Sequence, residues 1–276
     1  MYVGTEKVNV QTTIEDNPVQ AMLSLKNVSK RYGSGPEILT DLNMEVMHGE
    51  IVCLVGPSGV GKTTLLKSLA GLHDITTGTI EVNGRVMSGP PEEMALVFQD
   101  YNRSLMPWLT VEGNLKFPLR HLKLGRQEVS HRIKAALKEV GLERAGAKYP
   151  WQLSGGMQQR VAIARALAYK PQILIMDEPF ASVDAQTRFE LEDLTRSIRD
   201  DLGMTILLVT HDIDEAVYLS DRVVVLGGQP ATVLEVVDVP LGKQRDQVET
   251  RATPAYADLR SDVMRMIRTA SSASRA

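Results

Sequence analysis

The part of the sequence that most restricts the fold is an apolar block followed by a glycine-rich loop and a helical pattern. The block IVCLVG covers residues 51–56, the loop GPSGVGKTT covers residues 56–64, and TTLLKSLAGL continues over residues 63–72. A short block that is apolar at every position is typical of a strand buried on both faces of a parallel sheet. Since a turn and then a helix follow it, the order predicts an α/β fold.

The glycine-rich loop is suited to holding phosphate. It matches the pattern G-x-x-x-x-G-K-[ST], in which glycines let backbone N–H groups point inward and the next helix adds its positive end. We expect Lys62 to reach the β- and γ-phosphates of a nucleotide and the Thr63 hydroxyl to hold Mg²⁺. The residues expected to contact the nucleotide are Gly56, Pro57, Ser58, Gly59, Val60, Gly61, Lys62, Thr63 and Thr64. The alternative is a chance glycine-rich turn.

Two carboxylates follow a second apolar block. The stretch ILIMDEP, residues 173–179, brings Asp177 and Glu178 to the end of a predicted strand. A carboxylate there can hold Mg²⁺ through water, and its neighbour can polarise an attacking water. We therefore assign Asp177 to the metal and Glu178 to the general base. An Asp-Glu pair is common at strand ends, so this assignment depends on the phosphate loop in the same chain.

The rest of the chain divides around these strands. A third apolar block, TILLVTH, covers residues 205–211, while residues 21–32, 41–50 and 77–87 alternate apolar with polar and predict an antiparallel β layer. We expect an extension at residues 1–20, an ATPase core at 21–100 and 169–235, an inserted helical subdomain at 101–168, and a C-terminal extension at 236–276. Residues 241–249 are polar enough to be an extension or linker. Residues 254–270 predict a helix that packs on the core, or alternatively binds a partner.

Composition excludes several classes of protein. The formal net charge is −3 and charged residues make up 24% of the chain, so no basic surface for nucleic acid is expected. The N-terminal stretch has no basic start followed by an apolar run, so we expect no export signal. No apolar run approaches the ~20 residues that a membrane helix needs. The single cysteine, Cys53, lies in an apolar block and is expected to be a buried hydrophobic residue.

A second glycine-rich stretch, LSGGM at residues 153–157, opens another helical pattern. A serine followed by two glycines at the start of a helix exposes backbone N–H groups that suit a phosphate. The chain contains a single lysine-bearing phosphate loop of the kind seen at residues 56–64. A second phosphate cradle without a second nucleotide therefore implies a second copy of the chain.

With residues 153–167 added, the chain resembles the ATP-binding subunit of ABC transporters over residues 23–228. The motifs stand in that family's order: Tyr32, residues 56–64, Gln99, residues 153–157, residues 173–178, Asp184 and His211. The resemblance implies an α/β fold with a P-loop NTPase core, a RecA-like parallel sheet flanked by helices, together with an antiparallel β subdomain and an inserted helical subdomain. It also implies ATP and Mg²⁺ as cofactors and ATP hydrolysis coupled to transport.

The resemblance further implies a head-to-tail homodimer in which each ATP lies between two chains. The γ-phosphate held by Lys62 of one chain would face the second cradle of the other. The residues that would act across the dimer are Ser154, Gly155, Gly156, Met157 and Asp184. The family usually has Gln at the position of Met157, so any polar role there is lost or taken over by Gln158, while we expect the backbone contacts to remain.

The resemblance also assigns three further roles. Tyr32 would stack on adenine, although a tyrosine of the core or the surface is the alternative. Gln99, after the short apolar run ALVF, would touch both Mg²⁺ and water. His211 would contact the γ-phosphate and fix the attacking water beside Glu178. Catalysis is thus assigned to Glu178, His211 and Gln99, and the metal to Thr63, Gln99 and Asp177.

Residues 98–115 follow Gln99, at the place where importer subunits of this family receive a helix of the membrane partner. The apolar run of residues 106–109 would line the docking groove, with the subdomain's own core as the alternative for Leu105 and Leu109. The segments SLMPWLTV and DEPFASVDAQTR resemble the corresponding segments of the nitrate, sulfonate and taurine importers. The ATPase subunits of these importers lie at the cytoplasmic face of the inner membrane.

The implied partners are two transmembrane permease subunits and, indirectly, a periplasmic or extracellular solute-binding protein. The alternative is the ATPase of an exporter or lipoprotein-release system, which shares every catalytic motif. Less expected is a soluble ABC ATPase acting on DNA or ribosomes. Such a protein would carry a long coiled-coil insertion, zinc elements or a second cassette.

Overall fold

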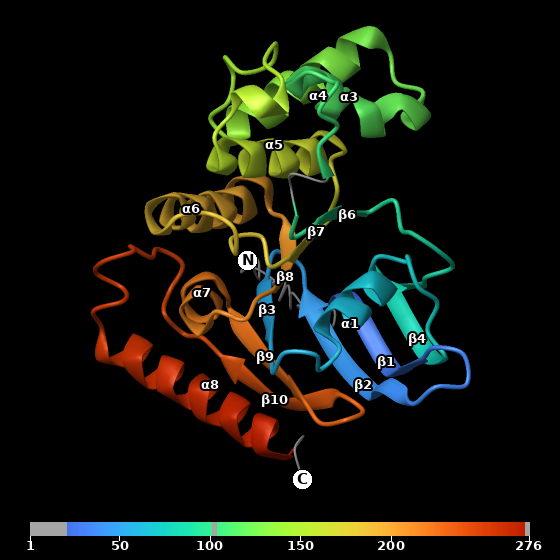
Figure 1. The fold of residues 1–276 in the computed structure, drawn as a ribbon, viewed down its shortest axis with the longest axis vertical. Helices are drawn as coiled ribbons and strands as arrows, with labels where there is room; N and C mark the ends of the chain where they lie inside the picture. Colours follow the sequence, from blue (N-terminus) through green and yellow to red (C-terminus); the bar gives the residue numbers. More distant parts are fainter. Residues whose placement is uncertain (1–20, 101–103, 274–276) are drawn as a thin grey trace, which may run out of the picture.

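A six-stranded sheet lies at the centre of the computed structural model, which describes residues 21–100 and 104–273 (Figure 1). The strand order is β10-β9-β3-β8-β7-β6, parallel throughout except for β10, which pairs antiparallel with β9. The strands are β3 Ile51–Val55, β6 Met94–Val97, β7 Ile173–Asp177, β8 Thr205–Val209, β9 Arg222–Gly227 and β10 Thr232–Asp238. Every residue of β3, β7 and β8 is buried, which confirms the three predicted apolar strands.

The predicted antiparallel layer is also present. It consists of β1 Ala21–Arg31, β2 Glu37–Met47, β4 Thr77–Val82 and β5 Arg85–Val86, in the order β2-β1-β4-β5. Leu23 of this layer shares one buried cluster with Val52 of β3 and Leu65 of α1, the helix Lys62–Leu69. The glycine-rich loop between β3 and α1 is thus fixed between two layers. Cys53 of β3 is buried and free, as expected.

Helices form a separate layer above one end of the sheet (Figure 1). They are α3 Val111–Lys116, η1 Phe117–Leu122, α4 Arg126–Glu139, η2 Pro150–Gln152 and α5 Gly155–Ala168. Ile133 and Leu137, four residues apart on α4, are both buried in the main core. Residues 101–103 of the expected subdomain, and the expected extension at residues 1–20, lie outside the described residues.

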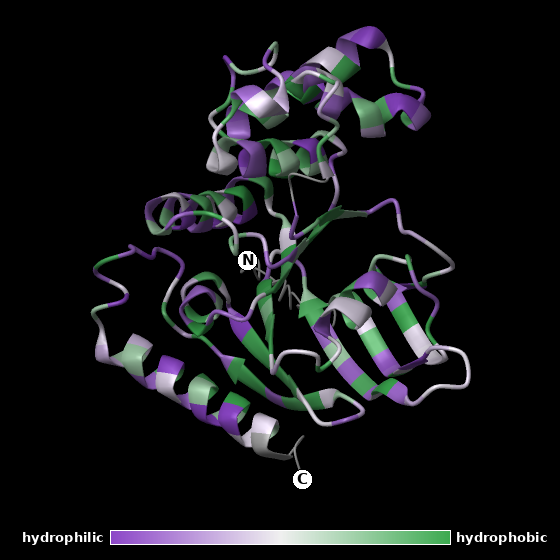
Figure 2. Cartoon of the chain, viewed as in Figure 1, coloured by the Kyte–Doolittle hydropathy of each residue, from purple (hydrophilic) through white to green (hydrophobic). Residues whose placement is uncertain are grey.

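Helices α6 Ala185–Leu202, α7 Ile213–Leu219 and α8 Pro254–Ala273 complete the described chain. Figure 2 shows α8 alternating between hydrophobic and hydrophilic residues along its length. Tyr256 and Val263 of α8 are buried in the main core, and the helix contacts α7, β9 and β10. The prediction that this helix packs on its own domain is therefore confirmed. Among the described residues, no helix is both long and apolar enough to cross a membrane.

Residues 241–249, expected to be an extension or linker, are tied to the core through Arg245. The guanidinium of Arg245 donates hydrogen bonds to the carbonyl oxygens of Val217, Tyr218 and Ser220, at the end of α7. Because the last carbonyl groups of a helix lack partners within the helix, Arg245 satisfies α7 from outside. Gln247 of the same segment donates hydrogen bonds to Glu192 and Asp193 of α6. No local sequence pattern reveals these contacts.

Candidate functional site

The loop of residues 56–64 connects β3 to α1 and is shaped by glycine. Gly61 precedes α1 with a φ of +113°, and a Cβ atom there would lie 2.9 Å from Cδ2 of Leu39. A Cβ at Gly56 would lie 2.5 Å from the carbonyl oxygen of Leu226 in β9. Larger residues would therefore push the loop away from the sheet. The structure forms the turn that a phosphate-binding loop requires.

Lys62 lies inside this loop. Its Nζ donates hydrogen bonds to the carbonyl oxygens of Gly56, at 2.8 Å, and Pro57, at 3.0 Å. Burial lowers the pKa of Lys62, while the nearby carboxylates of Glu178 and Asp177 raise it. The structure thus places one buried ammonium group between the loop backbone and two carboxylates from another strand.

Asp177 is the last residue of β7, and its side chain is buried. Burial and the neighbouring Glu178 raise the pKa of Asp177, and the lysines Lys67 and Lys62 lower it. A cation next to this carboxylate would offset both unfavourable contributions. Mg²⁺ is usually bound through one or two protein oxygen ligands, water and substrate phosphates. The Asp177 carboxylate and the Thr63 hydroxyl at the start of α1 supply a donor set of that kind.

Glu178 is the point on which residues from other strands converge. Its Oε2 accepts a hydrogen bond from Nε2 of Gln99 at 2.9 Å and lies 3.2 Å from Nδ1 of His211. Gln99 follows β6 and His211 follows β8, the two neighbours of β7 in the sheet. Glu178 itself has a φ of +43°, which is uncommon for a residue other than glycine. Gln99 and His211, which follow the two neighbouring strands, therefore both contact the same carboxylate oxygen of Glu178.

Tyr32 follows β1 as a surface residue, 43% exposed. Nζ of Lys30 lies 4.6 Å from its ring centroid, and the ring of His73 meets it edge-on at 5.5 Å. The side chains that contact the Tyr32 ring are thus basic or aromatic, and both lie outside the loop of residues 56–64. The exposed part of the ring is available for stacking.

The second cradle stands at the start of α5. The Ser154 hydroxyl accepts a hydrogen bond from the backbone N–H of Met157 at 3.3 Å, so it caps the helix as expected for a serine at that position. The Gln158 amide donates a hydrogen bond to the carbonyl oxygen of Leu153, just before the same helix. Gly155 is the exposed first residue of α5. Figure 1 shows α5 in the helical layer, separated from α1 and its loop.

Asp184 lies next to this cradle in the same chain. Its carboxylate accepts hydrogen bonds from the backbone N–H of Thr187, at 3.0 Å, and from the Thr187 hydroxyl, at 2.6 Å, and caps α6. These bonds hold the pKa of Asp184 below its usual value. A Cβ at Gly156 would lie 2.3 Å from Cγ2 of Thr187, so α5 and α6 touch where both begin.

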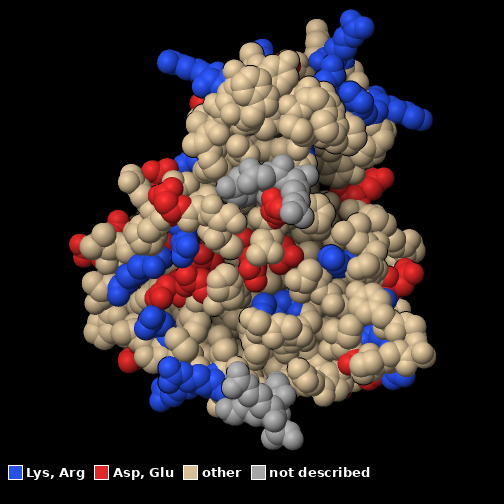
Figure 3. All heavy atoms as spheres, viewed as in Figure 1, with Lys and Arg blue, Asp and Glu red and all other residues tan. Residues whose placement is uncertain are grey.

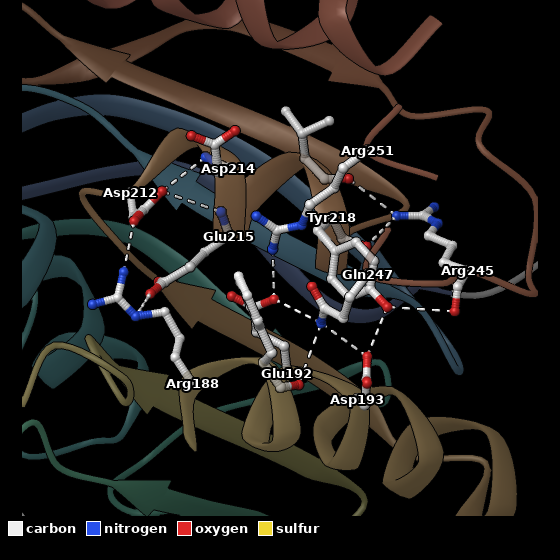
Figure 4. A network of polar contacts seen from close by, with 12 residues as sticks. Arg188, Glu192, Asp193, Asp212, Asp214, Glu215, Tyr218, Arg245, Gln247 and Arg251 are labelled. Atoms are coloured by element: carbon white, nitrogen blue, oxygen red, sulfur yellow. Dashed lines mark hydrogen bonds and ion pairs between the residues drawn. The ribbon is translucent and has the colours of Figure 1, made fainter. Parts of the chain in front are cut away.

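Sequence reasoning missed a group of buried polar residues near the start of α7, of which Figure 4 shows Glu215. Thr210 directly precedes His211, Glu215 lies four residues after it, and each of the two is at most 4% exposed. The Thr210 hydroxyl donates a hydrogen bond of 2.6 Å to Oε2 of Glu215. The signal in the sequence is HDIDE at residues 211–215, where Glu215 stands in the first turn of α7, close behind His211.

Glu215 gives the stability of the protein a pH dependence. Burial raises its pKa from 4.5 to about 7, with Asp212 and Glu192 adding to the increase and the Thr210 bond and Arg188 opposing it. Between these two pH values the folded chain binds more protons at this site than the unfolded chain. The free energy of unfolding should therefore fall as pH rises from 4.5 to 7, by roughly 3 kcal/mol from this group.

The measurement is urea unfolding of the parent and of Glu215→Gln between pH 4.5 and 8. Subtracting the two curves removes the contribution of every other titrating group. We expect the parent to lose stability relative to the variant as pH rises. Parallel curves for the two proteins would contradict this account of Glu215.

The chain is similar to known proteins in both sequence and fold. The family described as ABC transporter matches residues 39–181. The aliphatic sulfonates import ATP-binding protein of Bacillus licheniformis is 40% identical over 90% of this chain and 94% of its own length. The nitrate import ATP-binding protein of Synechococcus elongatus is 40% identical over 83% and 85%, respectively. A dimeric ATP-binding cassette in a post-hydrolysis state, bound to ADP and Pi, shares the fold with a TM-score of 0.69 and 33% identity, over 79% of this chain and 99% of that one.

Proposed function

Because this chain belongs to the ABC transporter family, we propose that it is the ATP-hydrolysing subunit of an importer for a small anion or organic solute of the nitrate, sulfonate or taurine type. The convergence of Gln99 and His211 on Oε2 of Glu178, beside the loop that holds Lys62, carries the assignment of hydrolysis. Two parts of the proposal, import as the direction of transport and the class of solute, are supported by the names of the relatives.

In this proposal the loop of residues 56–64 binds the phosphates of ATP, and Tyr32 stacks on adenine. Glu178 takes the proton of the attacking water as general base. The contacts of Gln99 and His211 fix the direction of its carboxylate, and His211 also faces the γ-phosphate. Thr63, Gln99 and Asp177 would hold Mg²⁺, which would neutralise charge on the β- and γ-phosphates.

We also propose that a second copy of the chain completes the ATP-binding site. The solved cassette that shares this fold at 33% identity is a dimer bound to ADP and Pi. Ser154, Gly155, Gly156 and Met157 at the start of α5 would contact the partner's γ-phosphate, with Asp184 beside them. The separation of α5 from α1 in Figure 1 supports a contact between chains rather than within one.

The membrane partner is proposed to dock at the edge of the helical layer. A groove of about 550 Å³ is lined there by Phe98, Met106, Phe117 and Pro118, among others. Trp108 is 73% exposed, whereas Leu105 is buried in the subdomain's own core. An apolar groove of this kind fits one helix, so two copies of the chain would receive one helix from each of two permease subunits. The chain would then lie peripherally at the cytoplasmic face of the inner membrane, and a solute-binding protein would act through the permease.

The proposed division of the chain follows from these roles. The core of residues 21–100 and 169–235 holds ATP, and the helical subdomain of residues 101–168 carries the second cradle and the docking groove. Asp and Glu gather between the two on the face seen in Figure 3, with Lys and Arg at the far end of the helical layer.

Uptake by the reconstituted transporter tests the proposal. The chain is purified with its co-expressed permease and placed in lipid vesicles with the matching solute-binding protein. We expect labelled nitrate, taurine or an alkyl sulfonate to cross the membrane only with ATP and only toward the side where the ATPase is bound. A complex containing Glu178→Gln is the control. ATP-driven movement in the opposite direction would favour the exporter alternative.

A further inference from the structure

The helix α6 reaches from Asp184 to the turn that carries His211. Arg188 lies one turn after Asp184, and its Nη1 donates a hydrogen bond of 3.1 Å to Oδ2 of Asp212. Its Nε lies 3.6 Å from Oε1 of Glu215. Asp212 follows His211 directly and caps α7 by accepting from the backbone N–H groups of the first turn. One guanidinium on α6 therefore holds both carboxylates that fix the histidine turn (Figure 4).

These contacts close a ring around His211. The Thr210 hydroxyl donates to Glu215 and accepts from the backbone N–H of Asp212. Arg188 joins Asp212 to Glu215 from the other side. The residues before and after His211 are thus both fixed, while the His211 side chain itself is 61% exposed and reaches Glu178.

Charge makes Arg188 the indispensable member of the ring. The Glu215 side chain is only 5% exposed, and those of Arg188 and Asp212 are about one-third exposed. Without the guanidinium, two carboxylates would face each other in a mostly buried site with no cation described between them. Such a pair separates or takes up a proton, and either response moves the turn that bears His211.

We propose that Arg188 is a positioning residue for ATP hydrolysis, which sets the place of His211 relative to Glu178 from a distance. The inference rests on the roles proposed above for these two residues. Arg188 lies on α6 and not on the loop of residues 56–64, so its loss should leave ATP binding alone. A small displacement of a catalytic group can lower the rate by about 100-fold. The expected signature is a lower kcat with an unchanged KM for ATP.

The test compares Arg188→Met with two other variants of the purified chain. We expect Arg188→Met to lower kcat by about 10- to 100-fold, with KM within about twofold of the parent. Arg188→Lys keeps the charge but loses the two-armed geometry, and should recover part of the rate. Arg260→Met is the matched control. Arg260 of α8 pairs with Asp214 in the first turn of α7, but it makes none of the contacts of the ring. The kcat of Arg260→Met should equal that of the parent.

A second variant keeps the test decisive if Arg188→Met does not fold. Asp212→Asn keeps the oxygen that caps α7 and removes the charge that meets Arg188, so it should show the same selective loss of kcat. The inference would be overturned if folded Arg188→Met, or Asp212→Asn in its place, had the parental kcat. It would also be overturned if a rise in KM for ATP accounted for the whole loss of activity. If the parent chain itself does not hydrolyse ATP, the proposed function fails, and that result is distinct from either of these.

Discussion

Glu178→Gln is expected to lower the rate of ATP hydrolysis by at least about 100-fold while ATP still binds. Glutamine has the shape of the glutamate side chain, but its amide cannot take a proton from water. The loop of residues 56–64 and Lys62 are unchanged, so affinity for ATP should stay within a few-fold. Phosphate release and an ATP titration measured on the same preparation separate the two quantities. Turnover at the parental rate would show that Glu178 is not the base.

The same variant should reveal the dimer, because bound ATP is no longer consumed. We expect light scattering after size exclusion to give a monomer without ATP and a dimer with it. A monomer in both conditions would point either to Met157 in the second cradle or to a need for the permease. Repeating the measurement with Met157→Gln separates these causes, since only a weakened cradle would be restored by the glutamine.

Lys62→Ala is expected to weaken ATP binding by about 10- to 100-fold, the usual loss when a charged hydrogen bond to phosphate is removed. The fold should survive, because burial lowers the pKa of Lys62 and the charge is therefore held there at a cost in stability. Titration with a fluorescent ATP analogue in the presence of Mg²⁺ measures the change. Lys26→Ala, a surface lysine paired with Glu81, is the control. Unchanged affinity in Lys62→Ala would remove Lys62 from the phosphate site.

The fold was predictable where the pattern is local. The apolar blocks that became β3, β7 and β8 are continuous in sequence and buried on both faces, and Ser154 stands at a helix start that its own residue type favours. Sequence analysis did not identify β9 or β10. Their positions depend on pairing with β3 and with each other, which no single window of sequence contains.

The candidate site divides in the same way. Glu178 could be named because it follows an apolar run, while Gln99 and His211 could be named only because the resemblance to a known family assigns them. The sheet brings the ends of these strands together. Arg188 and Glu215 could not be named, because their importance lies in meeting each other across α6 and α7. The residues assigned to act across a dimer stay predictions, since a single chain shows only the surface that a partner would meet.

The contact between Gly156 and Thr187 has a consequence for assembly. A methyl group fills the space where any larger residue at position 156 would place its Cβ, and Asp184 holds that threonine by two hydrogen bonds. The start of α5 and Asp184 are therefore tied together by direct contact. An approaching copy of the chain would meet them as one surface rather than as two separate ones.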